Sequence, residues 1–149
     1  MTIDYTLRRA TADDSDALFA LHRAALGPYI EAVFGPWDDE VQARFHREWF
    51  DADRVQVIEV SGALVGVLDC TVTAGELRLD RIAIDPARQN LGIGTAVLTD
   101  LLHQADERGL DSTLEVFDLN PAHHLYERLG FVEVARDGRK VQMRRSPVR

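Results

Sequence analysis

Residues 82–95 read IAIDPARQNLGIGT, and this stretch carries the strongest structural signal in the chain. Its apolar start predicts a buried strand, a proline-containing turn follows, and Gly92 and Gly94 lead directly into a helix. The first turn of a helix has unpaired N–H groups at the positive end of its dipole. Glycines let a phosphate approach these groups, and Arg88 and Gln89 add side-chain donors. The stretch therefore predicts an anion site, although a tight turn alone would also use such glycines.

Two nucleotide-binding motifs are excluded at this loop. No Gly-Lys-Ser/Thr follows the glycines, as a P-loop requires. Val97 stands near the position where the dinucleotide fingerprint places its third glycine. Pyrophosphate binding is compatible with the loop, but neither motif supplies it.

Outward from this loop, the pattern predicts a mixed α/β fold with the order β-α-α-β-β-β-α-β-α-β-β. Period-2 runs predict strands at residues 5–9, 54–60, 63–73, 76–84, 112–117, 131–135 and 140–144. Helical spacing predicts helices after Thr11, after Asp38 or Asp39, at 92–108 and at 121–129. We expect about seven strands in a central, mostly antiparallel sheet flanked by about four helices.

Glycine and proline mark the boundaries of these elements. Gly27-Pro28 is expected to end the first helix, and Ser61-Gly62 is expected to join two strands. Gly109 is expected to stop the long helix. In the second helix, Phe45 and Trp49 are expected to share an inward apolar stripe with Val41 and Phe50.

Composition bounds the class of protein. The 149 residues, 46% of them hydrophobic, are enough for one domain with its own core, expected over residues 1–149. The single cysteine, Cys70, expected in the core, allows no internal disulfide and fits a cytoplasmic protein. No secretory signal or membrane span is recognised, so no membrane partner is expected. The net charge of −8 disfavours nucleic acid and is compatible with a cationic partner or with solubility alone.

Two motifs together resemble the GNAT superfamily of N-acetyltransferases. Gln89-x-x-Gly92-x-Gly94 is similar to that family's Arg/Gln-x-x-Gly-x-Gly/Ala signature. Residues 120–131 read NPAHHLYERLGF, similar to its second signature, in which an Asn leads into a helix that bears a Tyr and ends in Gly-Phe. The element order agrees as well, so the resemblance covers nearly all of the chain.

The resemblance implies transfer of an acetyl group from acetyl-CoA to an amine, by direct attack in a ternary complex. The loop amides would hold the pyrophosphate of CoA, the backbone of the preceding strand would pair with the pantetheine arm, and Asn120 would contact pantetheine. The implied cofactor-binding residues are Ile82, Ala83, Ile84, Arg88, Gln89, Asn90, Leu91, Gly92, Ile93, Gly94, Thr95, Asn120, Ala122 and Tyr126. Such proteins are monomers or homodimers, and no metal is expected.

One feature of the strand before the loop agrees with this family reading. In a strand with regular alternation, Leu77 and Leu79 would point to one face, and Ile82 and Ile84 would point to the other. The alternation therefore slips by one position, as a β-bulge would cause. A strand buried on both faces would give the same pattern without a bulge.

The catalytic residues follow from the chemistry of acyl transfer. Tyr126, which the family places close to the sulfur, is the candidate general acid, although it could equally be a core aromatic residue of an amphipathic helix. Asp80 is the candidate base through a water, and Glu115 is a second possibility. Either carboxylate could instead form an ion pair with Arg78 or Arg81. The family often has its acidic residue earlier in this strand, so the base is open.

The acceptor site and the remaining polar residues are less constrained. Aromatic and acidic residues between the first two strands could hold a cationic acceptor, and we predict Tyr29, Trp37 and Glu115 as substrate residues. His123 and His124 are adjacent on a helix, so we expect them to be solvent-exposed and not joint metal ligands.

Three functions remain open at this stage. The first is an enzyme that acetylates a small-molecule amine. The second acts on a peptide or protein N-terminus or on lysine. The third, of a different class, is a non-catalytic acyl-CoA-binding module.

Overall fold

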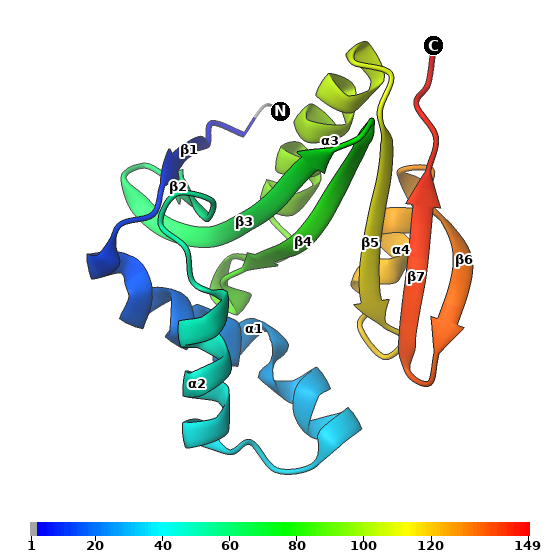
Figure 1. Ribbon diagram of the computed structural model, residues 1–149. Coiled ribbons are helices and arrows are strands. Elements are labelled where there is room, and N and C mark those ends of the chain that lie inside the picture. The colour runs from blue at the N-terminus through cyan, green and yellow to red at the C-terminus, as the bar shows by residue number, and fades with distance from the viewer. Residues whose placement is uncertain (1–2) are drawn as a thin grey trace. The chain divides into compact units, whose positions relative to one another are not determined.

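The computed structural model describes residues 3–149 and confirms the predicted order of strands and α-helices (Figure 1). Two short 3-10 helices, η1 and η2, are added to that order. The elements are β1 Thr6–Arg9, η1 Ala12–Asp14, α1 Ser15–Phe34, α2 Asp39–Trp49, β2 Gln56–Val60, β3 Ala63–Thr73, β4 Glu76–Ile84, η2 Pro86–Arg88, α3 Ile93–Glu107, β5 Asp111–Phe117, α4 Ala122–Arg128, β6 Val132–Asp137 and β7 Lys140–Arg145.

The strands form a seven-stranded sheet in the order β1-β2-β3-β4-β5-β7-β6. β4 and β5 are parallel, with Glu76–Leu79 in register with Asp111–Leu114. The pairs β1–β2, β2–β3, β5–β7 and β6–β7 are antiparallel. The expected mixed, mostly antiparallel sheet is confirmed.

The chain divides into two compact units, each with its own packing. The first contains the residues up to Asp69 together with Arg81–Gly94, and the second contains Cys70–Asp80 together with Thr95–Arg149. β3, β4 and α3 each contribute residues to both units.

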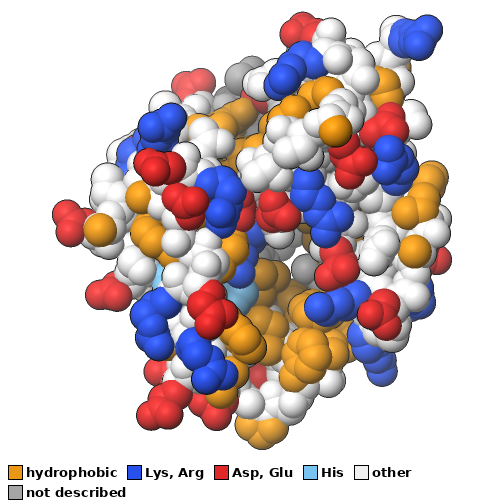
Figure 2. All heavy atoms as spheres, viewed as in Figure 1, with side chains coloured by type: hydrophobic (Ala, Val, Ile, Leu, Met, Phe, Trp, Pro, Cys, Tyr) orange, Lys and Arg blue, Asp and Glu red, His pale blue; other side chains and the backbone are white. Residues whose placement is uncertain are grey.

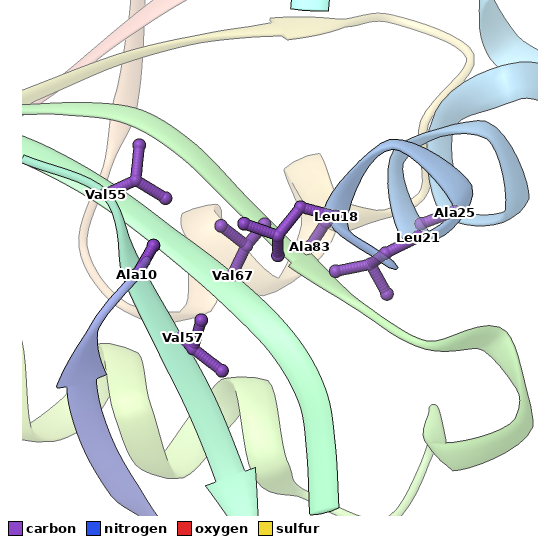
Figure 3. Close-up of a cluster of buried hydrophobic side chains, with 8 residues drawn as sticks. All are labelled: Ala10, Leu18, Leu21, Ala25, Val55, Val57, Val67 and Ala83. Carbon is purple, nitrogen blue, oxygen red and sulfur yellow. The ribbon is translucent and has the colours of Figure 1, made fainter. Parts of the chain in front are cut away.

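The core of the first unit lies between α1 and the strands. Leu18, Leu21 and Ala25 recur at helical spacing and form the buried face of α1. Leu18 points toward Val67 of β3 and Ala83 of β4 (Figure 3). The whole buried cluster comprises Ala10, Leu18, Leu21, Ala25, Val55, Val57, Val67 and Ala83.

The second unit joins its helices to the last strand through a buried arginine. Leu77, Ala105 and Leu110 form a small apolar cluster between β4 and α3. Arg145 of β7 donates two hydrogen bonds to the Asp106 carboxylate, at 2.8 and 3.1 Å. Those bonds lower the pKa of Asp106 to about 2. Arg145 also donates to the backbone oxygen of Leu129, so it fixes the end of α4 as well.

The predicted end of α1 at Gly27-Pro28 is wrong. The helix continues to Phe34, and Gly35, whose φ is +95°, ends it by donating its N–H to the oxygen of Glu31. Proline removes one helical hydrogen bond without preventing the helix from continuing. Gly27 is buried and lies under Trp37, so packing holds the helix together at this point.

The predicted apolar stripe of α2 is wrong at Phe45. This side chain is 52% exposed, whereas the neighbouring His46 is 6% exposed. His46 packs among the rings of Phe19, Trp49 and Phe50. An imidazole therefore occupies the inward position that the pattern assigned to a phenyl ring. The predicted cap is confirmed, because the Asp38 side chain accepts from the N–H of Val41.

The turns between strands follow their sequence signals. Ser61 and Gly62 both have positive φ, at +53° and +80°, and Val60 pairs with Ala63 across them. Two consecutive residues with positive φ are what a tight two-residue hairpin requires. Gly109, with φ of +66°, follows the end of α3, as predicted.

Each end of β4 contacts residues of α3 within its own unit. In the second unit, Leu77 packs with Ala105. In the first unit, the Cγ1 atom of Ile84 lies 3.6 Å from where a Cβ would stand on Gly94. The change of phase between the two ends of the strand stays a prediction.

Charged side chains of both signs cover the surface. Acidic and basic residues are interspersed on the face in Figure 2. Within residues 3–149, no helix combines the length and the apolar character that a membrane crossing requires.

We predict that Gly66→Ala lowers the free energy of unfolding by about 1–3 kcal/mol, because the site has no room for a methyl group. The new Cβ would lie 2.7 Å from the Ala83 carbonyl oxygen and 2.8 Å from Ile84 Cδ1. Urea denaturation measures the change. Gly27→Ala is the matched control at a buried glycine, because its Cβ would meet Trp37 at an ordinary 3.6 Å. Equal stability of the two variants would contradict the prediction.

Candidate active-site residues

The glycine loop of the first unit has the backbone form that an anion site needs. Asn90 and Gly92 have positive φ, at +65° and +85°. The Gln89 side chain donates to the backbone oxygen of Ile84, at 3.0 Å, and so ties the loop to the end of β4. Side-chain donation by Gln89 to a ligand, as predicted, would compete with this bond.

The backbone N–H groups of the loop are available to a ligand. In the described part of the chain, no backbone hydrogen bond uses the N–H of Asn90, Leu91 or Gly92. The first N–H groups of α3 also have no partner within the helix. A Cβ on Gly94 would meet only Ile84 at ordinary contact distance, so its absence leaves open space at the helix start. These residues fit a phosphate.

The end of β4 offers backbone groups on one edge. The N–H of Asp85 donates to the oxygen of Val65, and the Ala83 oxygen also lies against β3 at Gly66. Backbone groups alternate in direction along a strand, so those of Ile82 point away from β3. This is the arrangement that pairing with an extended ligand requires.

The other predicted residues of the loop are arranged around these amides. Arg88 forms an ion pair with Asp85, at 3.4 Å, that would compete with ligand binding. Leu91 and Thr95 are exposed, Ile93 is buried, and Gly94 is half-buried.

In the second unit, Asn120 caps α4. Its side-chain oxygen accepts from the N–H of Ala122, at 2.9 Å, and its backbone oxygen lies 2.8 Å from Nδ1 of His123. The side-chain oxygen is therefore engaged in the cap, and the amide NH₂ remains for a ligand.

Tyr126 is 7% exposed and lies on α4. Its ring meets Phe131 edge-on, with centroids 5.9 Å apart. Burial raises the pKa of the phenol to about 12, so the hydroxyl keeps its proton across the physiological range. Within residues 3–149, no hydrogen bond engages this hydroxyl.

Both candidate bases form ion pairs. Asp80 is exposed, lies 3.6 Å from Arg78 and accepts from the Thr71 hydroxyl at 3.4 Å. Glu115 is exposed and forms its ion pair with Lys140, at 3.6 Å. The predicted alternative partners were Arg78 and Arg81. Exposed pairs of this kind contribute little to stability.

The predicted cation site around Trp37 already has a cation. The Trp37 indole donates to Asp39 at 3.0 Å, and its backbone N–H donates to Glu31. The Arg23 guanidinium lies 5.3 Å from the ring centroid and is paired with Asp39. Tyr29 is half-buried on α1.

Comparison with known proteins agrees with this architecture. The model of the acetyltransferase (GNAT) family matches residues 17–131. The chain belongs to the GNAT family.

Relatives of this GNAT chain differ in their substrates. A mycothiol acetyltransferase of Clavibacter sepedonicus is 32% identical over 98% of the chain and 48% of its own length. A [ribosomal protein bS18]-alanine N-acetyltransferase of Haemophilus influenzae is 39% identical over 48% of the chain and 49% of its own length. The chain thus spans about half the length of these curated relatives.

Solved structures share the GNAT fold over nearly the whole chain. The PaiA N-acetyltransferase of Thermoplasma acidophilum, in complex with coenzyme A, has a TM-score of 0.75 at 17% identity and covers 97% of this chain and 99% of its own. The ribosomal-protein-S18-alanine N-acetyltransferase of Escherichia coli has a TM-score of 0.68 at 25% identity, covering 98% and 96%.

His123 and His124 lie closer together in this GNAT chain than their adjacent positions on a helix predicted, and the expectation that they are not joint metal ligands stays a prediction. Their ring centroids lie 3.9 Å apart, and their ligand atoms and those of Glu127 all lie within 4.8 Å of one another. The bond of His123 to Asn120 turns its ring toward its neighbour, which spacing alone could not reveal. His123 is half-buried, and His124 and Glu127 are exposed.

The first unit contains a group of buried polar side chains that the sequence did not predict. Asp69 is 1% exposed, and His22 and His46 are also buried. The His46 imidazole lies 3.0 Å from the Ser15 hydroxyl, while Nδ1 of His22 and Nδ1 of His46 are buried without a hydrogen-bond partner. No sequence signal marks them, because charged and polar residues are ordinarily exposed.

Burial lowers the pKa of His22 from 6.5 to about 3, and the charges of Arg81 and His46 add to the effect. The unfolded chain therefore binds a proton below about pH 6.5 that the folded chain does not bind until about pH 3. The stability contributed by the neutral imidazole is complete above pH 6.5 and is lost as the pH falls through this window.

We predict that the free energy of unfolding falls by about 1.4 kcal/mol per pH unit on account of His22 between pH 6 and pH 4. His22→Gln should remove this component of the slope in urea denaturation at a series of pH values. His103→Gln, at an exposed histidine, is the control and should keep the wild-type slope. Identical slopes in wild type and His22→Gln would refute the prediction.

Proposed function

We propose that this chain is an acetyl-CoA-dependent N-acetyltransferase and that residues 1–149 form a single GNAT domain. The observation that carries the proposal is the loop from Asn90 to Gly92, whose backbone N–H groups take part in no backbone hydrogen bond among the described residues and which leads into the start of α3. The family supplies the reaction class, and the CoA complex of the PaiA enzyme supports the co-substrate.

The residues that would hold acetyl-CoA follow from the available donors. The amides of residues 89–95 would bind the pyrophosphate, because the unpaired N–H groups of Asn90 to Gly92 lie next to the positive end of the α3 dipole. The N–H of Gln89 would have to give up its bond to the Pro86 oxygen to take part. The backbone of Ile82 and Ile84 would pair with the pantetheine arm. The amide nitrogen of Asn120 and the start of α4 at Ala122 would contact pantetheine.

Acetyl-CoA presents the acetyl group as a thioester. In the proposed direct attack, the neutral amine of the acceptor forms a C–N bond, the C–S bond breaks, and the amine loses a proton. The N–H of Ile82 would stabilise the negative charge that develops on the carbonyl oxygen, a contribution of about 3 kcal/mol in comparable sites. Tyr126 would give its proton to the departing thiolate, and its raised pKa keeps that proton in place until charge develops.

Asp80 is the proposed acceptor of the amine proton, through a water. It is exposed, so a water can reach it, and its ion pair with Arg78 would compete with that water. Glu115, paired with Lys140, is the second candidate.

We propose a small-molecule amine as the acceptor, with Tyr29 and Trp37 in the acceptor-binding segment. A peptide or protein N-terminus is the second candidate function, favoured by the two similar proteins named as S18-alanine N-acetyltransferases. Thiol release from acetyl-CoA, measured across small amines, amino acids and basic peptides, tests these classes. If no acceptor causes thiol release although acetyl-CoA still binds, the result would instead favour a non-catalytic binding module.

We predict that Tyr126→Phe lowers the rate of thiol release about 10²- to 10⁴-fold, because it removes the proton donor. The ring contact with Phe131 is kept, so acetyl-CoA affinity and the melting temperature should stay at wild-type values. Tyr5→Phe also removes a tyrosine hydroxyl, but in the first unit, and it should leave the rate unchanged. A wild-type rate in Tyr126→Phe would exclude the acid role.

We predict that Gly94→Val weakens acetyl-CoA binding at least about tenfold, because the new side chain fills space at the start of α3 and hinders approach to its amides. Isothermal titration with acetyl-CoA measures the affinity. Thr99→Val, at an exposed position of the same helix, is the control and should bind as the wild type does. Equal affinities for both variants would argue against this loop as the pyrophosphate site.

A further inference from the structure

Arg81 is a cation in the first unit without a hydrogen-bonded counter-ion. It lies in β4, half-buried, and its guanidinium carbon lies 3.8 Å from the centroid of the Trp49 ring. In the part of the chain that the structure describes, no hydrogen bond or ion pair engages its nitrogens. Burial lowers its pKa to about 10, so it stays charged at neutral pH.

The one buried carboxylate nearby is already engaged. Oδ1 of Asp69 accepts from Nε of Arg54 at 2.8 Å, and Oδ2 accepts from the Trp49 indole at 2.7 Å. Arg54 also donates to the Trp49 backbone oxygen. Asp51 also lies 3.5 Å from Arg54. Among the described residues both carboxylates therefore pair with Arg54 and neither pairs with Arg81, whose positive charge stays without an ion-pair partner while the ring beneath it is held in place.

The neighbouring histidines add no negative charge. His22 and His46 are buried, and burial holds the pKa of each below its usual value, so both are neutral at pH 7. A ligand that complements the charge of Arg81 among these neutral side chains is an anion. A guanidinium presents a planar fork of donors that matches a carboxylate, and an aromatic ring behind it leaves that fork free.

We propose that Arg81 binds the carboxylate of the acceptor, so that the enzyme acetylates a small amine that also carries a carboxylate, of the α-amino acid class. This inference rests on the proposed function. Arg81 directly precedes Ile82, whose backbone we assign to the pantetheine arm. An anion held by Arg81 therefore lies beside the strand segment at which the thioester is expected.

The test compares each amino acid that is acetylated with its own primary carboxamide, which keeps the amine and removes the negative charge. For the wild type, kcat/KM for the acid should exceed that for the amide about 10- to 100-fold. Arg81→Met should abolish this preference by raising KM for the acid alone, and Arg81→Lys should restore part of it. Arg44→Met, at the arginine that lies over the Phe45 ring, is the matched control and should keep the preference.

A second measurement does not need turnover. Binding of an N-acetyl amino acid and of its amide, in the presence of CoA, is followed by tryptophan fluorescence, because Trp49 lies under Arg81. Preferential binding of the acid, lost in Arg81→Met, supports the carboxylate site even if no amine is acetylated and the proposed function fails.

Three results would overturn the inference. The wild type could treat acids and amides alike in both assays. Arg81→Met could weaken both equally, which would make Arg81 a structural residue. The preference could follow a carboxylate on the acyl group, as in succinyl-CoA, instead of one on the acceptor.

Discussion

Strand β4 has to present its side chains to two different helices, and the rest of the structure depends on how it does so. Leu77 packs with α3, and Ala83 packs in the cluster of α1. In the first unit, Arg81 lies over Trp49, and the backbone of Ile82 points away from β3. One short stretch of β4 therefore carries both the partly buried cation and the strand edge on which the proposed function depends.

The neighbouring strand accommodates β4 through a single missing side chain. At Gly66, the Ala83 carbonyl oxygen occupies the space that a Cβ would need. The proposed thioester segment is therefore supported by backbone packed directly on backbone. The side chains of Ile84 and Ile58 also border this space, so a backbone oxygen and two buried or half-buried side chains together limit the movement of the segment.

Sequence patterns predicted the fold well where local chemistry dictates the backbone. Ser61-Gly62 and Gly109 need positive φ, which few residues adopt readily, so the turns were readable from composition. The end of α1 was not readable, because Pro28 lacks only one hydrogen bond and burial of Gly27 under Trp37 outweighs that loss. Local propensity gives way to tertiary packing at such positions.

The candidate site residues also differ in how well the sequence predicts them. The loop at Gly92 and Gly94 was predicted because its glycines have a backbone purpose that spacing reveals. Arg81 and Asp69 were not, since their importance lies in which partners they have after folding. Phe45 is exposed and His46 is buried, the reverse of what their hydrophobicity predicts. A hydrophobicity pattern does not include the ability of an imidazole to pack among aromatic rings.

The buried phenol of Tyr126 has a consequence for the choice of acceptor. Held in its protonated form, it can give a proton in the proposed reaction but cannot take one from the amine, which leaves that step to Asp80 or Glu115. The proposed attack begins with a neutral amine, so the fraction of the acceptor that is neutral affects the rate. The α-amine of a peptide N-terminus, with an ordinary pKa near ~8, is neutral in roughly one molecule in ten at pH 7, whereas an amine like that of lysine, near ~10.4, is neutral in fewer than about one in a thousand. In the proposed reaction, a weakly basic acceptor would therefore react faster at neutral pH than a strongly basic one.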